Sequence, residues 1–230
     1  MKTLVRNFLT VMLLTCKLSL LMGQTVFPSY QTKDELKEDV ATIIQDFDLF
    51  MKDRGITPPF VPGVQVETAP FLIKWDGPNQ QVILPYWDEL WDEQKKLFRA
   101  WQGDNAEEFF TSLFNWFFVP HELGHFIEAS FNKNELTPYQ SEIAANEFAI
   151  AFLSSLKENQ KKMEYIRKNL EEVIKALPPI DFGDLSEEEY FNKNYQNLGS
   201  NPNVYGYYQF NFILNILENQ DQIDLQKYTN

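Results

Sequence analysis

Two histidines and a glutamate near the middle of the chain have a spacing that suits metal chemistry. His121 and His125 are four residues apart, and Glu122 directly follows the first of them. On an α-helix, positions four apart lie on the same face, so both imidazoles could reach one metal ion. The carboxylate of Glu122 could then approach a water molecule bound to that ion. The pattern predicts a metal centre with a carboxylate placed to accept a proton from water.

The composition favours this interpretation over coincidence. The 230-residue chain contains only two histidines, and both belong to the motif. Five-residue patterns do arise by chance, so a purely structural role stays open as the alternative. The single cysteine, Cys16, leaves no thiolate ligand in the rest of the chain, so zinc would need nitrogen and oxygen ligands.

A second predicted helix supplies the candidate for the third ligand. Thr137 followed by Pro138 is typical of a helix start, with threonine at the N-cap and proline at the first helical position. Glu142 lies in the first turn, and Asn146 lies one turn later on the same face. If this helix runs antiparallel to the motif helix, Glu142 faces the two histidines and a fourth position is left for water. Glu147 is a weaker candidate, because it lies off the Asn146 face.

The paired motifs resemble those of a known group of enzymes. His121 to His125, followed by Glu-Ile-Ala-Ala-Asn from Glu142 to Asn146, looks like the compact gluzincin-type zinc metallopeptidases. The pattern is similar to the ImmA/IrrE-type peptidases and to other bacterial metallopeptidase families, over residues 117–153. The resemblance implies one Zn²⁺ ion held by His121, His125 and Glu142, with Glu122 as the general base.

Three further residues are candidates for supporting roles. Asn146 is suited to accept a hydrogen bond from a ligand imidazole through its amide oxygen, which would orient the ring. Tyr205 or Tyr208 could place a hydroxyl near the metal and stabilise the oxyanion that forms during hydrolysis. Tyrosines just before a helix are more often packing residues, and that alternative stays open for both.

These residues need a mainly helical scaffold, and the hydrophobic pattern predicts one. Apolar residues recur at helical spacing along most of the chain, and three short β-rich runs, residues 64–66, 71–75 and 81–84, precede the motif helix. We expect an α+β, mainly helical fold with a zincin-like core, in which a small antiparallel sheet precedes the motif helix and a second helix carries the third ligand. Gln81 to Leu84 is the expected edge strand for pairing with an extended peptide, or else a purely structural strand.

Two residues within the motif helix make specific demands on the backbone. Pro120 removes a backbone donor just before His121 and should kink the helix or restart it. Gly124 costs about 1 kcal/mol relative to alanine in a helix, so we expect another backbone or a tightly packed group to approach it closely.

The N-terminal residues predict export. Basic residues precede an interrupted apolar stretch, so residues 1–23 are the expected signal peptide and residues 24–230 a single domain. Lipoprotein anchoring through Cys16 is the alternative. Lys17 interrupts the apolar stretch, and we expect no stable transmembrane span. A periplasmic or secreted location would differ from that of the ImmA/IrrE regulators, which are cytoplasmic.

The net charge narrows the class of partner. A formal charge of −13 repels nucleic acid phosphates and anionic lipid head groups, so neither is an expected partner. The sequence therefore predicts a zinc-dependent peptidase that acts on a peptide or protein substrate. The alternative is a non-catalytic metal-binding or protein-interaction module on a metallopeptidase-like fold.

Overall fold

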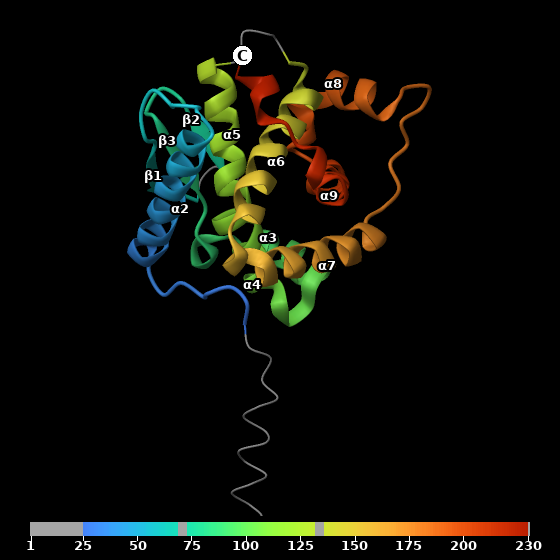
Figure 1. The fold of residues 1–230 in the computed structure, drawn as a ribbon. Helices are drawn as coiled ribbons and strands as arrows, with labels where there is room; N and C mark the ends of the chain where they lie inside the picture. The colour runs from blue at the N-terminus through green and yellow to red at the C-terminus, as the bar shows by residue number, and fades with distance from the viewer. Residues whose placement is uncertain (1–24, 69–72, 132–135, 230) are drawn as a thin grey trace, which may run out of the picture.

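The computed structural model describes residues 25–68, 73–131 and 136–229, and there the chain is mainly helical with one small sheet (Figure 1). The expected signal peptide and Cys16 lie outside the described residues. The described α-helices are α2 (Lys33–Asp53), α3 (Asp92–Gln102), α4 (Ala106–Phe110), α5 (Phe118–Phe131), α6 (Pro138–Ser155), α7 (Gln160–Ala176), α8 (Glu187–Leu198) and α9 (Pro202–Glu218). Among the described helices, none is both long and apolar enough to cross a membrane.

The sheet has three strands in the spatial order β1 (Gly63–Val66), β3 (Gln81–Leu84) and β2 (Lys74–Asp76). β2 and β3 pair antiparallel, as predicted, whereas β1 pairs parallel to β3. The sheet is therefore mixed, and the expectation of an antiparallel sheet is wrong. Gln81–Leu84 is the central strand, so the expectation that it forms the edge is also wrong. Strand order depends here on the packing of β1 against α2, a tertiary contact that short strand patterns do not encode.

The two helices that carry the motifs, α5 and α6, lie side by side at the centre of the fold (Figure 1). The sheet and α2 pack against α5, and α8 and α9 pack against α6. A Cβ atom at Gly124 would lie only 2.8 Å from the Ala145 Cα atom of α6. The predicted close approach at Gly124 is confirmed, and it sets the short distance between the two helices.

The motif helix runs through Pro120 without a break. α4 passes into a π-helical segment, η3 (Thr111–Phe117), which passes directly into α5. At this junction the Phe118 N–H donates to the Leu113 carbonyl, five residues earlier. Proline lacks an N–H and its ring crowds the preceding turn, so a wider turn just before it relieves that conflict. The helix therefore does not restart at Pro120.

The start of α6 follows the predicted cap. The Thr137 hydroxyl accepts from the Gln140 N–H at 3.3 Å, and the Gln140 side chain accepts from the Thr137 N–H at 3.2 Å. This reciprocal pair fixes where the helix begins, and with it the rotation that turns Glu142 toward α5.

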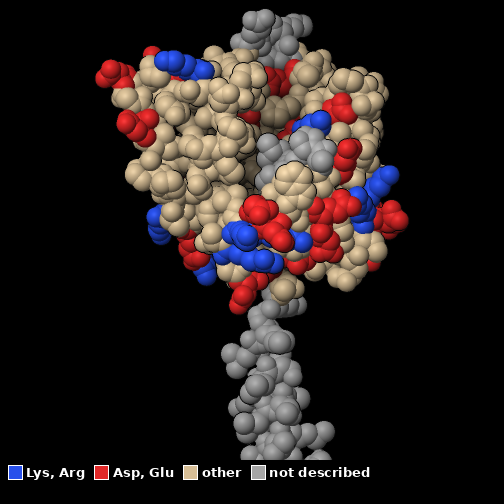
Figure 2. All heavy atoms as spheres, turned by 180° about the vertical axis from the view of Figure 1, so that it is seen from behind, with Lys and Arg blue, Asp and Glu red and all other residues tan. Residues whose placement is uncertain are grey.

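Charged side chains are unevenly distributed over the surface. Figure 2 shows the face opposite to that of Figure 1, where acidic and basic side chains gather in the lower part. Uncharged side chains cover much of the left and middle of this face, and charged side chains lie at its upper left edge and beside the hollow near its top.

Candidate metal centre

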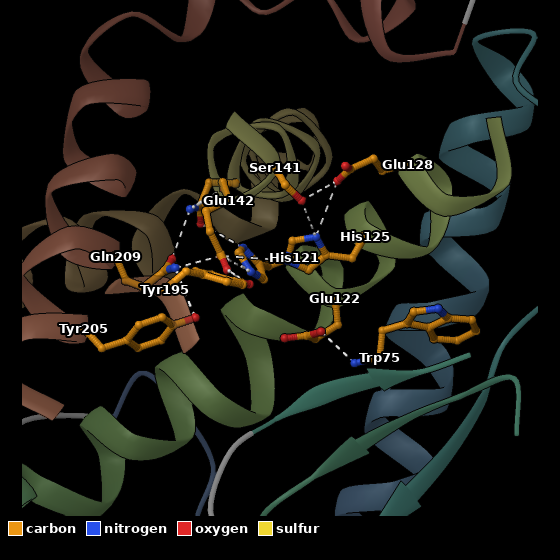
Figure 3. Close-up of polar contacts among 11 residues, drawn as sticks. Trp75, His121, Glu122, His125, Glu128, Ser141, Glu142, Tyr195, Tyr205 and Gln209 are labelled. Atoms are coloured by element: carbon orange, nitrogen blue, oxygen red, sulfur yellow. Dashed lines mark hydrogen bonds and ion pairs between the residues drawn. The ribbon is translucent and has the colours of Figure 1, made fainter. Parts of the chain in front are cut away.

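Three side chains converge between α5 and α6 (Figure 3). His121 Nε2 lies 3.3 Å and His125 Nε2 lies 3.8 Å from the same oxygen, Glu142 Oε2. The three ligand atoms lie within 4.8 Å of one another. Ligand atoms about 2.1 Å from a tetrahedral ion are about 3.4 Å apart, so this spacing fits one ion. The group could hold a metal ion and would fill three of its four positions.

The centre is buried on one side and reachable on the other. His121 and Glu142 are each 2% exposed, whereas the His125 side chain is 22% exposed. The contact between Gly124 and Ala145 brings the helices close enough for ligands from both to meet. Of the three candidate ligands, His125 is therefore the one that solvent reaches.

Glu147, the weaker candidate for the third ligand, belongs to another contact. Its carboxylate pairs with Lys227 at 2.8 Å and accepts from the Tyr228 hydroxyl at 3.0 Å. Because Glu147 follows Glu142 by five residues on the helix, it lies on a different face, which contacts the C-terminal segment.

His121 is oriented by Asn146. The ring Nδ1 lies 3.1 Å from Asn146 Oδ1, and Asn146 Nδ2 donates to the Glu142 carbonyl at 2.9 Å. The second bond fixes which end of the amide faces the ring, so His121 Nδ1 carries the proton and donates. In the neutral ring, Nε2 is then the nitrogen without a proton, the one that can bind a metal ion. The structure thus places Asn146 against the imidazole of a candidate ligand, as the sequence predicts.

His125 has a charged partner instead. Its Nδ1 lies 3.6 Å from Glu128 Oε2 and 3.3 Å from the Ser141 hydroxyl, which donates to Glu128 at 2.7 Å. A carboxylate beside the ring N–H fixes the tautomer and makes Nε2 a stronger ligand. Sequence reasoning missed Glu128 and Ser141. The signal for Glu128 was its spacing of three residues from His125, which places both on one helix face.

Glu142 is held by two residues from the C-terminal helices. The Tyr195 hydroxyl of α8 donates to Oε1 at 3.0 Å, and Gln209 Nε2 of α9 donates to Oε2 at 2.8 Å. The Gln209 side chain also accepts from Asn146 at 3.2 Å and donates to the Tyr205 hydroxyl at 3.3 Å. Both residues were missed. Gln209 follows Tyr205 by four residues on one helix face, whereas nothing local in the sequence points to Tyr195.

The ligand group forms an ion pair in the absence of a metal. Burial opposes ionisation of Glu142, but its hydrogen bonds to His121 and His125 outweigh burial and hold its pKa well below the ordinary value. Burial also opposes the charged form of His125, yet hydrogen bonds to Glu128 and Glu142 raise its pKa well above the ordinary value. An imidazolium therefore faces a carboxylate at neutral pH.

Glu122 lies beside the ligand group and is not part of it. Its Oε2 accepts from the Trp75 N–H of β2 at 2.7 Å. Burial raises the pKa of the Glu122 carboxyl above its ordinary value, against the lowering effect of the two imidazoles. A carboxylate with a raised pKa is a better proton acceptor at neutral pH.

The two candidate tyrosines have different surroundings. The Tyr205 hydroxyl lies beside Gln209, and its ring lines the pocket that opens next to the motif residues. Burial raises the Tyr205 pKa well above its ordinary value, so the phenol keeps its proton. The Tyr208 hydroxyl donates to the Glu187 carbonyl at 3.0 Å, and its ring is buried in a cluster with Phe191, Leu198 and Phe212. The structure brings Tyr205 to the site and gives Tyr208 the packing role that was the alternative.

A pocket reaches the centre from the side of α9. Two motif residues, His121 and Glu122, form one end of it together with Tyr205 and Gln209. The site therefore combines a place for a metal ion, a proton acceptor, an O–H donor and space for another molecule. Comparison of the chain with protein-family models, curated proteins and solved structures found no match.

Proposed function

We propose that the protein is a zinc-dependent peptidase, which hydrolyses peptide bonds with a zinc-activated water and Glu122 as general base. One observation carries the proposal. A three-ligand group of two imidazoles and a carboxylate lies beside a buried glutamate whose pKa is raised, and one of its ligands, His121, lines the same pocket as that glutamate. A purely structural metal site has no need for the second feature.

Zinc is the ion that this ligand set suits best. Two histidines and one glutamate form the ligand set of several catalytic zinc sites, whereas structural zinc sites mostly fill all four positions with protein ligands, often thiolates. The group found among the described residues offers three ligands and no thiolate. A zinc ion held there would lower the pKa of a water molecule and polarise a substrate carbonyl.

The residues of the chain supply the proton transfers. Glu122 accepts a proton from the attacking water as the new C–O bond forms, and it passes that proton to the amine as the C–N bond breaks. Tyr205 donates its phenolic proton toward the carbonyl oxygen, where negative charge develops. Gln209 donates to the Tyr205 oxygen, so the phenol proton stays available for the substrate.

The fold around the centre supports a zincin-like core as part of this proposal. A sheet lies beside the motif helix, and the helix that follows carries the third ligand. The strand next to the centre is β2, whose Trp75 N–H points at Glu122. β2 is an edge strand of the three-stranded sheet, so it replaces Gln81–Leu84 as the candidate for pairing with an extended peptide.

Metal analysis and a broad peptide library test the proposal together. Wild-type protein should bind about one equivalent of zinc and cleave library members only when zinc is present. Glu122→Gln keeps the ligands and should retain zinc while losing cleavage by at least about a hundredfold. Glu93→Gln, a charge-matched change on an exposed side chain, should alter neither property. Zinc binding without cleavage of any peptide would instead support the non-catalytic module.

A further inference from the structure

We propose that the pocket beside Glu122 receives a large apolar side chain of the substrate, of the phenylalanine or leucine kind, next to the bond that is cut. This inference rests on the proposed peptidase function and adds the class of residue that the enzyme selects.

The pocket joins a polar end to apolar walls. His121, Glu122 and Tyr205 form the polar end, where a substrate carbonyl would be held. The walls come from α3, the π-helical segment, α5 and α9, and they include Leu97, Phe98, Trp101, Phe114, Phe118 and Phe210. A peptide whose carbonyl lies at the polar end must therefore place a neighbouring side chain between these walls.

The walls favour an apolar side chain over a charged one. Among the described lining residues there is no lysine, arginine or aspartate. A charged substrate side chain would lose its water here without gaining an ion pair, and an acidic one would also face the carboxylate of Glu122. A large apolar side chain instead moves from water to a pocket lined by aromatic rings, and this transfer is favourable.

The aromatic walls hold one another in place. Trp101 packs edge-on against Phe98, with ring centroids 5.7 Å apart, and against Phe210, with centroids 5.9 Å apart. Phe98 also packs edge-on against Phe114 at 5.8 Å. Because the rings interlock, the walls have a defined shape. The cavity between these walls has a volume of about 90 Å³.

A glycine keeps one wall open. Gly206 lines the pocket from within α9, and a Cβ atom there would lie 3.2 Å from Cε2 of the Phe210 ring. Glycine weakens a helix, so its place in α9 has a cost in stability. A larger side chain at Gly206 would enter the pocket or push Phe210 into it. This position therefore allows the pocket to be narrowed without changing a ligand residue.

The test compares amino-acid hydroxamates, whose common hydroxamate group binds zinc while the side chain varies. Calorimetry of the full-length, zinc-loaded protein would give the affinities of acetohydroxamate and of the N-acetyl hydroxamates of phenylalanine, leucine, alanine and aspartate. Gly206→Leu narrows the pocket, and Leu97→Ala widens it. Asn215→Leu places the same new side chain on an exposed position of α9 and is the matched control. A peptide library is digested in parallel.

We expect the phenylalanine and leucine compounds to bind at least about tenfold more tightly than the alanine and aspartate compounds. Gly206→Leu should remove this preference, while Asn215→Leu should keep both the preference and the acetohydroxamate affinity. Leu97→Ala should shift the preference toward the larger phenylalanine compound. Equal affinities for all side chains, or a preference that neither pocket variant changes, would overturn the inference. Cleavage without an apolar preference contradicts the pocket alone, whereas tight binding of the phenylalanine compound without any cleavage contradicts the peptidase.

Discussion

Gln209 donates through Nε2 to Glu142 Oε2 at 2.8 Å, and this is the same carboxylate oxygen that lies nearest to both histidines. The amide is 1% exposed, so its hydrogen bonds do not compete with water. Its oxygen also accepts from Asn146, the residue that orients His121. One side chain of α9 therefore positions two of the three candidate ligands.

Replacing Gln209 with methionine should weaken zinc binding by about 10- to 100-fold, a range typical of residues that orient metal ligands. Methionine is of similar length but cannot donate, so Glu142 Oε2 loses a partner and the Asn146 amide loses an acceptor. Competition with a chelator would give the zinc affinity, and circular dichroism would check the fold. Gln196→Met, on an exposed position of α8, is the control and should bind zinc as the wild type does. An unchanged zinc affinity in Gln209→Met would show that Glu142 needs no such support.

Tyr195→Phe should weaken zinc binding less, by about tenfold or below. The Tyr195 hydroxyl donates to Oε1, which is not the carboxylate oxygen that approaches the histidines. Tyr207→Phe removes a hydroxyl that bonds to Glu187 at the surface, and it should leave the zinc affinity unchanged. The same chelator competition measures both variants. A larger effect for Tyr195→Phe than for Gln209→Met would mean that Oε1 is the ligand oxygen.

The sequence revealed those parts of the site that depend on spacing along a single helix. His121 and His125, like Glu142 and Asn146, are four residues apart, and helix geometry alone brings each pair to one face. Tyr195 and Gln209 lie 53 and 67 residues after Glu142 in the sequence, and they contact it only because α8 and α9 pack beside α6. The order of the strands has the same origin. Contacts that fold distant segments together leave no local pattern, so these features were missed or predicted wrongly.

Gly124→Ala should destabilise the protein although alanine is the better helix former. The substitution gains about 1 kcal/mol in helix propensity. Its Cβ would lie 2.8 Å from the Ala145 Cα and 3.0 Å from the Ala145 carbonyl oxygen, and backbone atoms cannot turn aside as a side chain can. Overpacking costs about 1–3 kcal/mol, and because two backbone atoms are in the way and α5 has to move from α6, we expect the upper half of that range. The net loss is then about 1–2 kcal/mol.

Urea unfolding of the metal-free protein measures this loss. Gly63→Ala is the matched control, because the nearest atom to its added Cβ is 3.6 Å away and its stability should not fall in the same way. The wider spacing between the helices in Gly124→Ala should also lower the zinc affinity. A variant as stable as the wild type would refute the claim that glycine is required for the close approach.

Zinc binding should release a proton at pH 7. Although burial disfavours the charged ring, hydrogen bonds to Glu128 and Glu142 raise the pKa of His125 well above its ordinary value, so the metal-free ring is protonated. Zinc binds only the neutral imidazole, and below the His125 pKa its apparent affinity should therefore rise by up to about tenfold per pH unit. Calorimetry at pH 7 in two buffers of different ionisation enthalpy counts the released protons, and we expect about one. Glu128→Gln removes a carboxylate beside the ring, lowers the His125 pKa and should reduce the count, whereas Glu218→Gln on an exposed position should not. If the wild type released no proton, the ion pair between His125 and Glu142 would not exist in the metal-free protein.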